Sequence, residues 1–199
     1  MSWNYGWLML CLALLVDSGL TQSTPRFICS TNEPRTDREF NEWIRSDVRW
    51  LVTNAERTAF ANLKSGNDRR EFVQNFWRRR DPDPDTSANE FRDTYCGRLP
   101  LTKRFESGIP GWKTDRGRIL LLWGEPDKIL TGKENIEGDV VTVFEKWTYK
   151  HLDDLGTDIY VTFVDPTQTK EFRFAKSDLG WLDKYFADAA MGLRSESRR

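Results

Sequence analysis

The residues of this chain that could do chemistry are arginines and carboxylates that stand near tryptophan or threonine at the ends of the expected elements. An arginine fork binds a carboxylate through two parallel hydrogen bonds, and a nearby tryptophan can cover such a pair and exclude water. Two interpretations follow: a binding or catalytic cleft, or a buried ion-pair network that joins the helical part of the fold to the sheet. We favour the network, because structural networks of this kind are common. The candidate residues are Arg80, Asp81, Glu90, Trp112, Thr114, Asp115, Arg116, Glu125 and Asp127.

Several familiar kinds of active site are excluded by the sequence. The single histidine, His151, cannot support a site that needs two His ligands. Aspartates alternate over residues 81–85 as in a calcium loop, but Thr86 and Arg92 stand where that loop needs Gly and Glu. Phosphate-binding glycine loops, dinucleotide fingerprints, serine nucleophile elbows and C-x-x-C motifs are also missing. We therefore expect neither a metal ion nor a cofactor.

Length and charge narrow the class of protein further. The chain has 199 residues, with 30 Lys and Arg against 31 Asp and Glu. This near-neutral balance argues against a nucleic-acid binder, which needs a basic face. The length suits one domain of ordinary size with a small extension, and nine Trp and twelve Phe supply large side chains for its core.

The N-terminus carries an unbroken run of ten apolar residues, 7–16. A membrane-spanning helix needs about 20 such residues, whereas a run of this length fits the apolar region of a secretory signal peptide. We predict a signal peptide over residues 1–20, with cleavage between Ser18 and Gln22, and no transmembrane segment in the mature chain. The protein would then be periplasmic or extracellular. A buried helix of the mature protein is the alternative.

Removal of that segment leaves two cysteines, Cys29 and Cys96. Two thiols in an oxidising compartment can pair, so they are a disulfide candidate. Such a bond would close a long loop and stabilise the fold by roughly 3 to 5 kcal/mol. Two unpaired cysteines are the alternative, because a sequence does not test the geometry of a bond.

Helices are expected first along the chain. Residues 21–35 lack a period and contain two prolines, so they are interpreted as a linker or an arm that lies on the domain. A capping box at Thr36 and Glu39 opens a helix whose apolar stripe continues to Val52. Further helices are expected up to residue 106.

After Gly111 the spacing of apolar residues changes to every second position, which is typical of strands. The expected strands cover residues 118–123, 140–149, 157–164 and 171–174. Their short connections favour an antiparallel meander over a parallel sheet. The predicted fold is therefore α+β, with a helical half (36–106), an antiparallel sheet of about four strands (111–175) and a C-terminal helix (177–193). Residues 36–194 are expected to form a single domain.

The most distinctive string covers Gly111 to Arg118 and reads G-W-K-T-D-R-G-R, with G-E-P-D following at Gly124 to Asp127. Together with surrounding strings in the same order, it resembles the GWxTD domain family of bacteria over about residues 36–175. The surrounding strings are Trp43-Ile44 with Asp47-Val48, Glu56 with Phe60 and Leu63, Arg70 with Phe72-Val73, Phe76-Trp77, Arg80-Asp81-Pro82, Asn89-Glu90, Phe105, Trp147-Thr148-Tyr149, and Phe163 with Asp165. The resemblance implies an exported envelope protein without an assigned activity.

One stretch departs from the family pattern. The helix after Asn89-Glu90 usually carries a Glu-His pair, whereas this chain has residues 93–98, D-T-Y-C-G-R, followed by Pro100. A family function that needs that histidine would be absent from this chain.

The string around Gly111 is expected to form a tight turn that leads into the first strand. Trp112 is large and apolar, so it should pack against the helical half near Trp77 or Phe76. Asp115 should then face an arginine, either Arg80 or Arg116.

Two functions from different classes are expected. The first is an exported, envelope-associated interaction module that binds a protein or peptide partner without a cofactor. The second is a hydrolase of an envelope polysaccharide, which would use paired carboxylates, Asp115 with Glu125 or Asp81 with Glu90, within roughly 5 to 9.5 Å of each other in an open cleft. Carboxylates that are each buried against an arginine would favour the module. A purely structural envelope domain is the third possibility.

Overall fold

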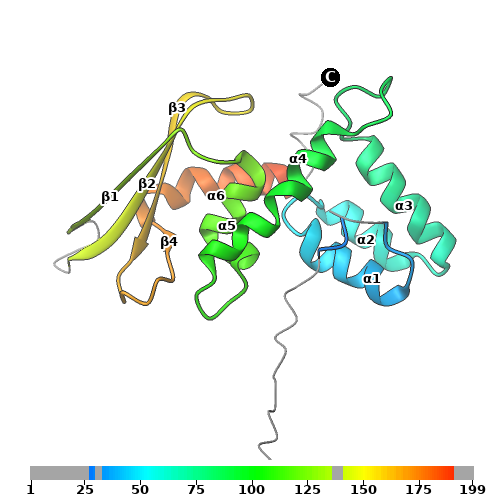
Figure 1. The fold of residues 1–199 in the computed structure, drawn as a ribbon, viewed down its shortest axis with the longest axis horizontal. Helices are drawn as coiled ribbons and strands as arrows, with labels where there is room; N and C mark the ends of the chain where they lie inside the picture. Colours follow the sequence, from blue (N-terminus) through cyan, green and yellow to red (C-terminus); the bar gives the residue numbers. More distant parts are fainter. Residues whose placement is uncertain (1–26, 30–32, 136–140, 191–199) are drawn as a thin grey trace, which may run out of the picture.

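The computed structural model describes residues 27–29, 33–135 and 141–190. Within these residues helices gather at one end of the molecule and an antiparallel sheet forms the other end (Figure 1). The predicted α+β class, with helices first and a helix last, is confirmed. The predicted signal peptide lies outside the described residues. No helix in the described part of the chain is long and apolar enough to cross a bilayer.

Side-chain caps decide where the first helices begin. Thr36 and Glu39 form the predicted capping box, Thr53 and Glu56 form a second one, and the hydroxyl of Ser65 caps the third helix. The helices of this half are α1 (Asp37–Glu42), the π-helix η1 (Trp43–Asp47), α2 (Asn54–Asn62), α3 (Gly66–Arg78), α4 (Glu90–Arg98) and the 3₁₀ helix η2 (Pro100–Phe105).

The predicted helix from Thr36 to Val52 is interrupted after its first turns. α1 ends at Glu42 and the wider η1 continues it. The Ser46 hydroxyl donates to the Glu42 carbonyl oxygen, and such a side-chain bond competes with the regular helical ladder. The stretch still presents its apolar stripe to the core of the helical half, where Trp43 is fully buried among aromatic rings.

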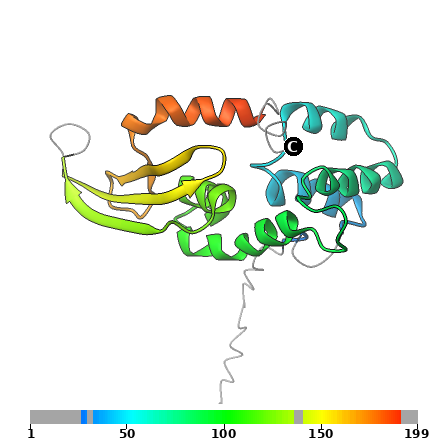
Figure 2. The same cartoon turned by 90° about the horizontal axis from the view of Figure 1, so that it is seen from above.

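Four antiparallel strands form one sheet in the order β1-β2-β3-β4, so the predicted meander of about four strands is confirmed. The strands are β1 (Lys128–Glu134), β2 (Thr142–Leu152), β3 (Gly156–Asp165) and β4 (Arg173–Phe174). Trp147 lies opposite Val161, and both are buried on the face that packs against α6 (Lys176–Ala190) and against α5 (Asp115–Trp123). Figure 2 shows α6 running from the sheet toward the helical half.

The predicted strand over residues 118–123 is wrong, because this segment is helical. After the short η3 (Gly111–Lys113), α5 (Asp115–Trp123) runs through the middle of the molecule (Figure 1). Its apolar run is continuous because the helix is buried on several sides: Leu121 belongs to the helical core, whereas Leu120 and Trp123 belong to the core under the sheet. A short apolar run does not distinguish a buried helix from a buried strand.

The strand that the sequence analysis missed is β1. Seven of its residues pair with β2, from Lys128 opposite Thr148 to Glu134 opposite Thr142. Most of its side chains are exposed, including those of Ile129 and Leu130, so the strand has no alternating burial pattern. A strand without that alternation has no period of two to detect.

The N-terminal arm is fixed to the helical half by one covalent bond and one buried carboxylate. Cys29 and Cys96 form a disulfide, with Cα atoms 5.8 Å apart. The Oδ2 atom of Asp47 accepts hydrogen bonds from the N–H groups of Ile28 and Cys29 at 2.7 and 2.8 Å. Asp47 is 1 % exposed, and burial raises its pKa to about 6.

Stability should therefore depend on pH through Asp47. Because the folded state binds this proton more tightly than the unfolded state, the stability linked to Asp47 is full below about pH 4 and is lost as pH rises through about 6. Asp47→Asn removes the charge and keeps an oxygen acceptor. We expect the free energy of unfolding of the wild type, relative to Asp47→Asn, to fall by on the order of 3 kcal/mol across this range, as measured by urea denaturation.

Asp47→Ala is the matched control, because it also removes the acceptor for two backbone N–H groups. We expect it to be less stable than Asp47→Asn at every pH. A stability difference between wild type and Asp47→Asn that stays constant with pH would contradict the role assigned to the buried charge.

Candidate functional site

The Gly111–Arg118 string builds the start of α5. The Thr114 hydroxyl caps the helix: it accepts from the Gly117 N–H at 3.0 Å and donates to the Gly111 carbonyl oxygen at 2.7 Å. Trp112 is buried in the helical core, in the cluster that also contains Phe76 and Trp77. Its carbonyl oxygen accepts from the indole N–H of Trp50 at 2.7 Å.

Two glycines of the string allow backbones to approach more closely than any side chain would permit. A Cβ atom on Gly111 would lie 1.8 Å from the Thr102 carbonyl oxygen, and one on Gly117 would lie 1.9 Å from the Gly111 carbonyl oxygen. Real Cβ atoms essentially never come so close to backbone atoms. The glycines therefore set how tightly η2, η3 and α5 pack.

Asp115 does not face Arg80 or Arg116, so that prediction is wrong. Its Oδ2 atom accepts from the backbone N–H of Phe174 in β4 at 2.8 Å. The expected partner was a charged side chain. The observed partner is a backbone group 59 residues away, which no side-chain pattern reveals. Burial raises the pKa of Asp115 above its ordinary value.

Arg116 forms the main ion pair between α5 and the sheet. Its guanidinium lies 2.9 Å from Glu145 in β2 and donates to the Lys170 carbonyl oxygen at 3.1 Å. It also lies 4.0 Å from the centre of the Phe172 ring. The indole N–H of Trp147 donates to the second oxygen of Glu145 at 3.0 Å, so tryptophan, arginine and carboxylate form a connected network.

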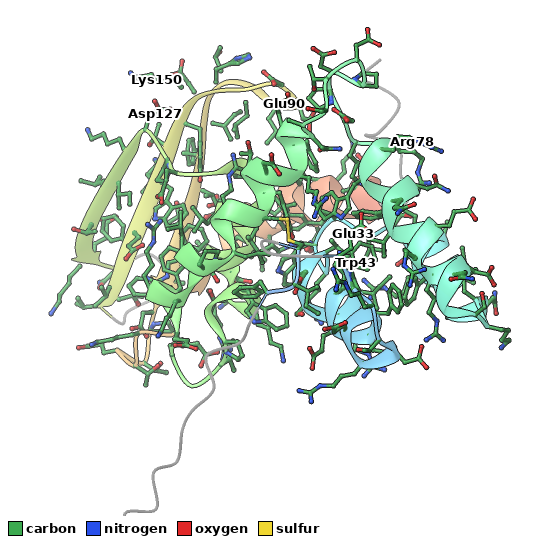
Figure 3. All side chains as sticks on the ribbon, turned by 45° about the vertical axis from the view of Figure 1, so that its right-hand side comes forward. Glu33, Trp43, Arg78, Glu90, Asp127 and Lys150 are labelled. Atoms are coloured by element: carbon green, nitrogen blue, oxygen red, sulfur yellow. A yellow bond between two sulfur atoms is a disulfide. The ribbon has the colours of Figure 1, made fainter. Side chains whose placement is uncertain are left out.

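Glu125 and Asp127 lie beyond the other end of α5, in two separate places. Glu125 forms a two-bond pair with Arg104 at 2.6 and 2.7 Å, and both side chains are about half exposed. Asp127 accepts from the backbone N–H of Lys150 at 2.7 Å. Figure 3 shows Asp127 and Lys150 together at the sheet, apart from Arg78 and Glu90 in the helical half.

Arg80 also has a structural contact. Its guanidinium binds both oxygens of Glu56, at 3.0 and 2.9 Å, and stacks over the Phe76 ring at 3.7 Å. Glu56 is the residue that completes the capping box of α2. The pair therefore joins the end of α3 to the start of α2.

The structure does not bring the nine candidate residues into one cleft. Of the nine, Arg80, Asp81 and Glu90 line one pocket, which has a volume of about 640 Å³ and lies between the helical half and α6. The other six lie along or beyond α5. The pocket receives four aromatic side chains and four arginines: Trp50, Phe91, Tyr95 and Tyr185, with Arg78, Arg79, Arg80 and Arg98.

Arg98 is the pocket residue that the sequence analysis missed and that has the clearest role. It donates to the Leu121 carbonyl oxygen at 3.0 Å, in the last turn of α5, where unpaired carbonyl groups attract a cation. Burial lowers the pKa of its guanidinium below the ordinary value. The arginine follows Gly97 in a helix with little amphipathic pattern, so its spacing carried no signal.

Among residues 27–29, 33–135 and 141–190, no group of three or more His, Cys, Asp or Glu side chains is placed to hold a metal ion.

The glycine contacts give a direct test of how α5 is packed. Gly117→Ala places a Cβ on the Gly111 carbonyl oxygen, so we expect a loss of about 3 kcal/mol or more in unfolding free energy. Gly97→Ala is the matched control: it lies in α4 with no atom within 4 Å of its Cβ. We expect that change to stabilise the protein by about 0.5 to 1 kcal/mol. Chemical denaturation measures both, and equal effects would contradict the packing.

Asp115 can be tested by removing its acceptor oxygens. Asp115→Ala leaves the Phe174 N–H without its partner. We therefore expect the free energy of unfolding, measured by thermal denaturation, to fall by about 1 to 3 kcal/mol. Asp115→Asn keeps an oxygen that can accept from the same group and should cost less. Equal stability of Asp115→Ala and the wild type would show that the bond to β4 does not hold the sheet.

Comparison with known proteins agrees with the placement of the string. A family model described as the GWxTD domain matches residues 16–185. No curated protein and no solved structure matches the chain. The residues that give the family its letters, Gly111, Trp112, Thr114 and Asp115, are those that build and anchor the start of α5. Because the family model covers most of the sequence, this chain belongs to the GWxTD domain family.

Proposed function

We propose that this chain is an exported interaction module of the bacterial envelope, which binds a protein or peptide segment without a cofactor. The observation that carries the proposal is the pocket between the helical half and α6, because aromatic and arginine side chains line it together. Tryptophan, tyrosine and arginine are the side chains that contribute most to protein interfaces. The pocket volume of about 640 Å³ is large enough for a few side chains of a partner.

Each wall of the pocket contains side chains that are buried or hydrogen-bonded within the fold. Tyr95 is buried in the helical core, and Arg98 is fixed on the carbonyl groups of α5. Tyr185 comes from α6, where its hydroxyl accepts from the indole N–H of Trp123 at 3.0 Å. A partner bound here would contact both halves, so binding would also strengthen their association.

The hydrolase alternative is weakened by the positions of its carboxylates. Asp115 and Glu125 lie at opposite ends of the nine-residue α5, which is about 13 Å long at 1.5 Å per residue. Glycoside hydrolysis needs the two carboxyl groups within roughly 5 to 9.5 Å. Asp115 is also bonded to Phe174, and Glu125 to Arg104.

The second proposed pair, Asp81 and Glu90, shares the pocket and remains the specific basis for a hydrolase. Turnover of a polysaccharide by the purified protein, abolished by Asp81→Asn or Glu90→Gln without loss of thermal stability, would favour that function over the module.

The interaction module can be tested from within the pocket. Thr94 is exposed on α4 and lines the pocket, whereas its neighbour Asp93 is exposed and does not. A photo-crosslinking amino acid at position 94, in the full chain expressed in its own host, should give one discrete adduct with an envelope protein. The same group at position 93 should not. Mass spectrometry identifies the partner, which is then purified.

Thr94→Trp should fill the pocket and weaken binding of the purified partner at least about tenfold, while Asp93→Trp leaves it unchanged. Isothermal titration measures both affinities. Adducts of equal yield from the two positions, or equal affinities of the two tryptophan variants, would exclude the pocket as the binding site.

A further inference from the structure

A second hollow lies on another face of the helical half. It has a volume of about 650 Å³ and is bounded on one side by the exposed face of α1 and η1 and on the other by η3. Its charged and aromatic lining residues are Arg38, Glu42, Arg45, Arg49, Trp112 and Lys113. We call this hollow the basic groove. It shares no lining residue with the pocket described above.

Four cations and one carboxylate line the basic groove, and the carboxylate is already used. Glu42 pairs with Arg38 at 2.8 Å. The side chains of Arg45, Arg49 and Lys113 have no hydrogen bond and no carboxylate within 4.0 Å among the residues that the structure describes. Two of them lie beside aromatic rings instead: Arg49 is 4.9 Å from the centre of the Trp50 ring, and Lys113 is 5.0 Å from that of Trp112.

A further cation, Arg118, contacts the same tryptophan ring as Arg49. The guanidinium of Arg118 lies 4.4 Å from the centre of the Trp50 ring. It has no carboxylate within 4.0 Å in the described part of the chain. Burial, together with the charge of Arg49, lowers the pKa of Arg118 to about 10, although Asp115 opposes this shift. Unlike Arg80 and Arg116, and unlike Arg38, the groove cations Arg45, Arg49 and Lys113 therefore have no carboxylate partner among the described residues.

The cations are spread along the groove and do not converge on a point. Arg38 lies in α1, Arg45 in η1 and Arg49 in the turn after η1, and all three line the same hollow. Arg38 and Arg49 are eleven residues apart, so at the α-helical rise of 1.5 Å per residue the row of cations is at most about 16 Å long, the length of about five residues of extended peptide. A single small anion could not contact all of these side chains.

We propose that the basic groove binds an extended acidic peptide segment of a partner protein, with Arg45, Arg49 and Lys113 contacting its carboxylates and Trp112 forming an apolar wall. A lipid surface is less suited to it, because none of the exposed large apolar side chains among the described residues lines the groove. The inference does not depend on the pocket between the two halves, since the lining residues differ.

The test uses the full mature chain and fluorescein-labelled hexaglutamate as the probe. Fluorescence anisotropy should show binding at low salt and its loss at about 1 M salt, where charges are screened beyond about 3 Å. The double variant Arg45→Glu with Arg49→Glu should weaken binding about tenfold or more. Lys128→Glu with Lys133→Glu, on the exposed strand β1, makes the same change in net charge and should alter affinity less than about twofold.

Thermal unfolding of each variant shows whether it is folded. Lys113→Glu provides an independent test of the other wall of the groove and should also weaken binding. No binding of hexaglutamate at low salt, or equal weakening by the two double variants, would overturn the proposal.

Two other probes identify competing ligands. Inorganic phosphate that binds with the same dependence on Arg45 and Arg49 would reassign the groove to small oxyanions. Vesicles of phosphatidylglycerol that bind in preference to hexaglutamate would reassign it to a membrane surface. Either result would exclude the acidic peptide as its ligand.

Discussion

The burial of α5 is the constraint on which the rest of the structure depends. The two larger hydrophobic cores both contain residues of this one helix, so neither of them is complete without it. A buried helix has unpaired N–H groups at its start and unpaired carbonyl groups at its end, and these need partners inside the protein. Thr114 supplies a partner at the start and Arg98 at the end. The Gly, Trp, Thr and Asp residues that give the family its name therefore position a helix between two hydrophobic cores.

The sequence was most informative where a local rule is sufficient. The capping box at Thr36, the meander of four strands and the closing helix depend on neighbouring residues or on a simple period, and all three were predicted. α5 was not, because a helix buried on several sides has the same unbroken apolar run as a buried strand. β1 was not predicted either, because its side chains are exposed on both faces and leave no pattern.

Partners that are distant in the sequence were the hardest to predict. Arginine and carboxylate were recognised as the important residue types, but the pairing of Arg80 with Glu56 and of Arg116 with Glu145 depends on which helix faces which strand. The bond from Asp115 to the Phe174 backbone is beyond any rule based on side-chain type. The pocket could be predicted only in part, because its walls come from α3, α4 and α6 together.

The disulfide has a consequence for the order of folding. Cys29 precedes all the helices of the helical half and Cys96 lies in the last turn of α4, so the closed loop contains α1, η1, α2 and α3 and none of the sheet. During synthesis from the N-terminus, the first thiol emerges 67 residues before the second. Oxidation must therefore wait for the chain that becomes α4, and it then closes a loop that contains the segments of α1, η1, α2 and α3. In a reducing solution the sheet keeps its strand connections and its own core. The helical half loses its only covalent cross-link in the described residues. The two halves should therefore differ in their sensitivity to reductant.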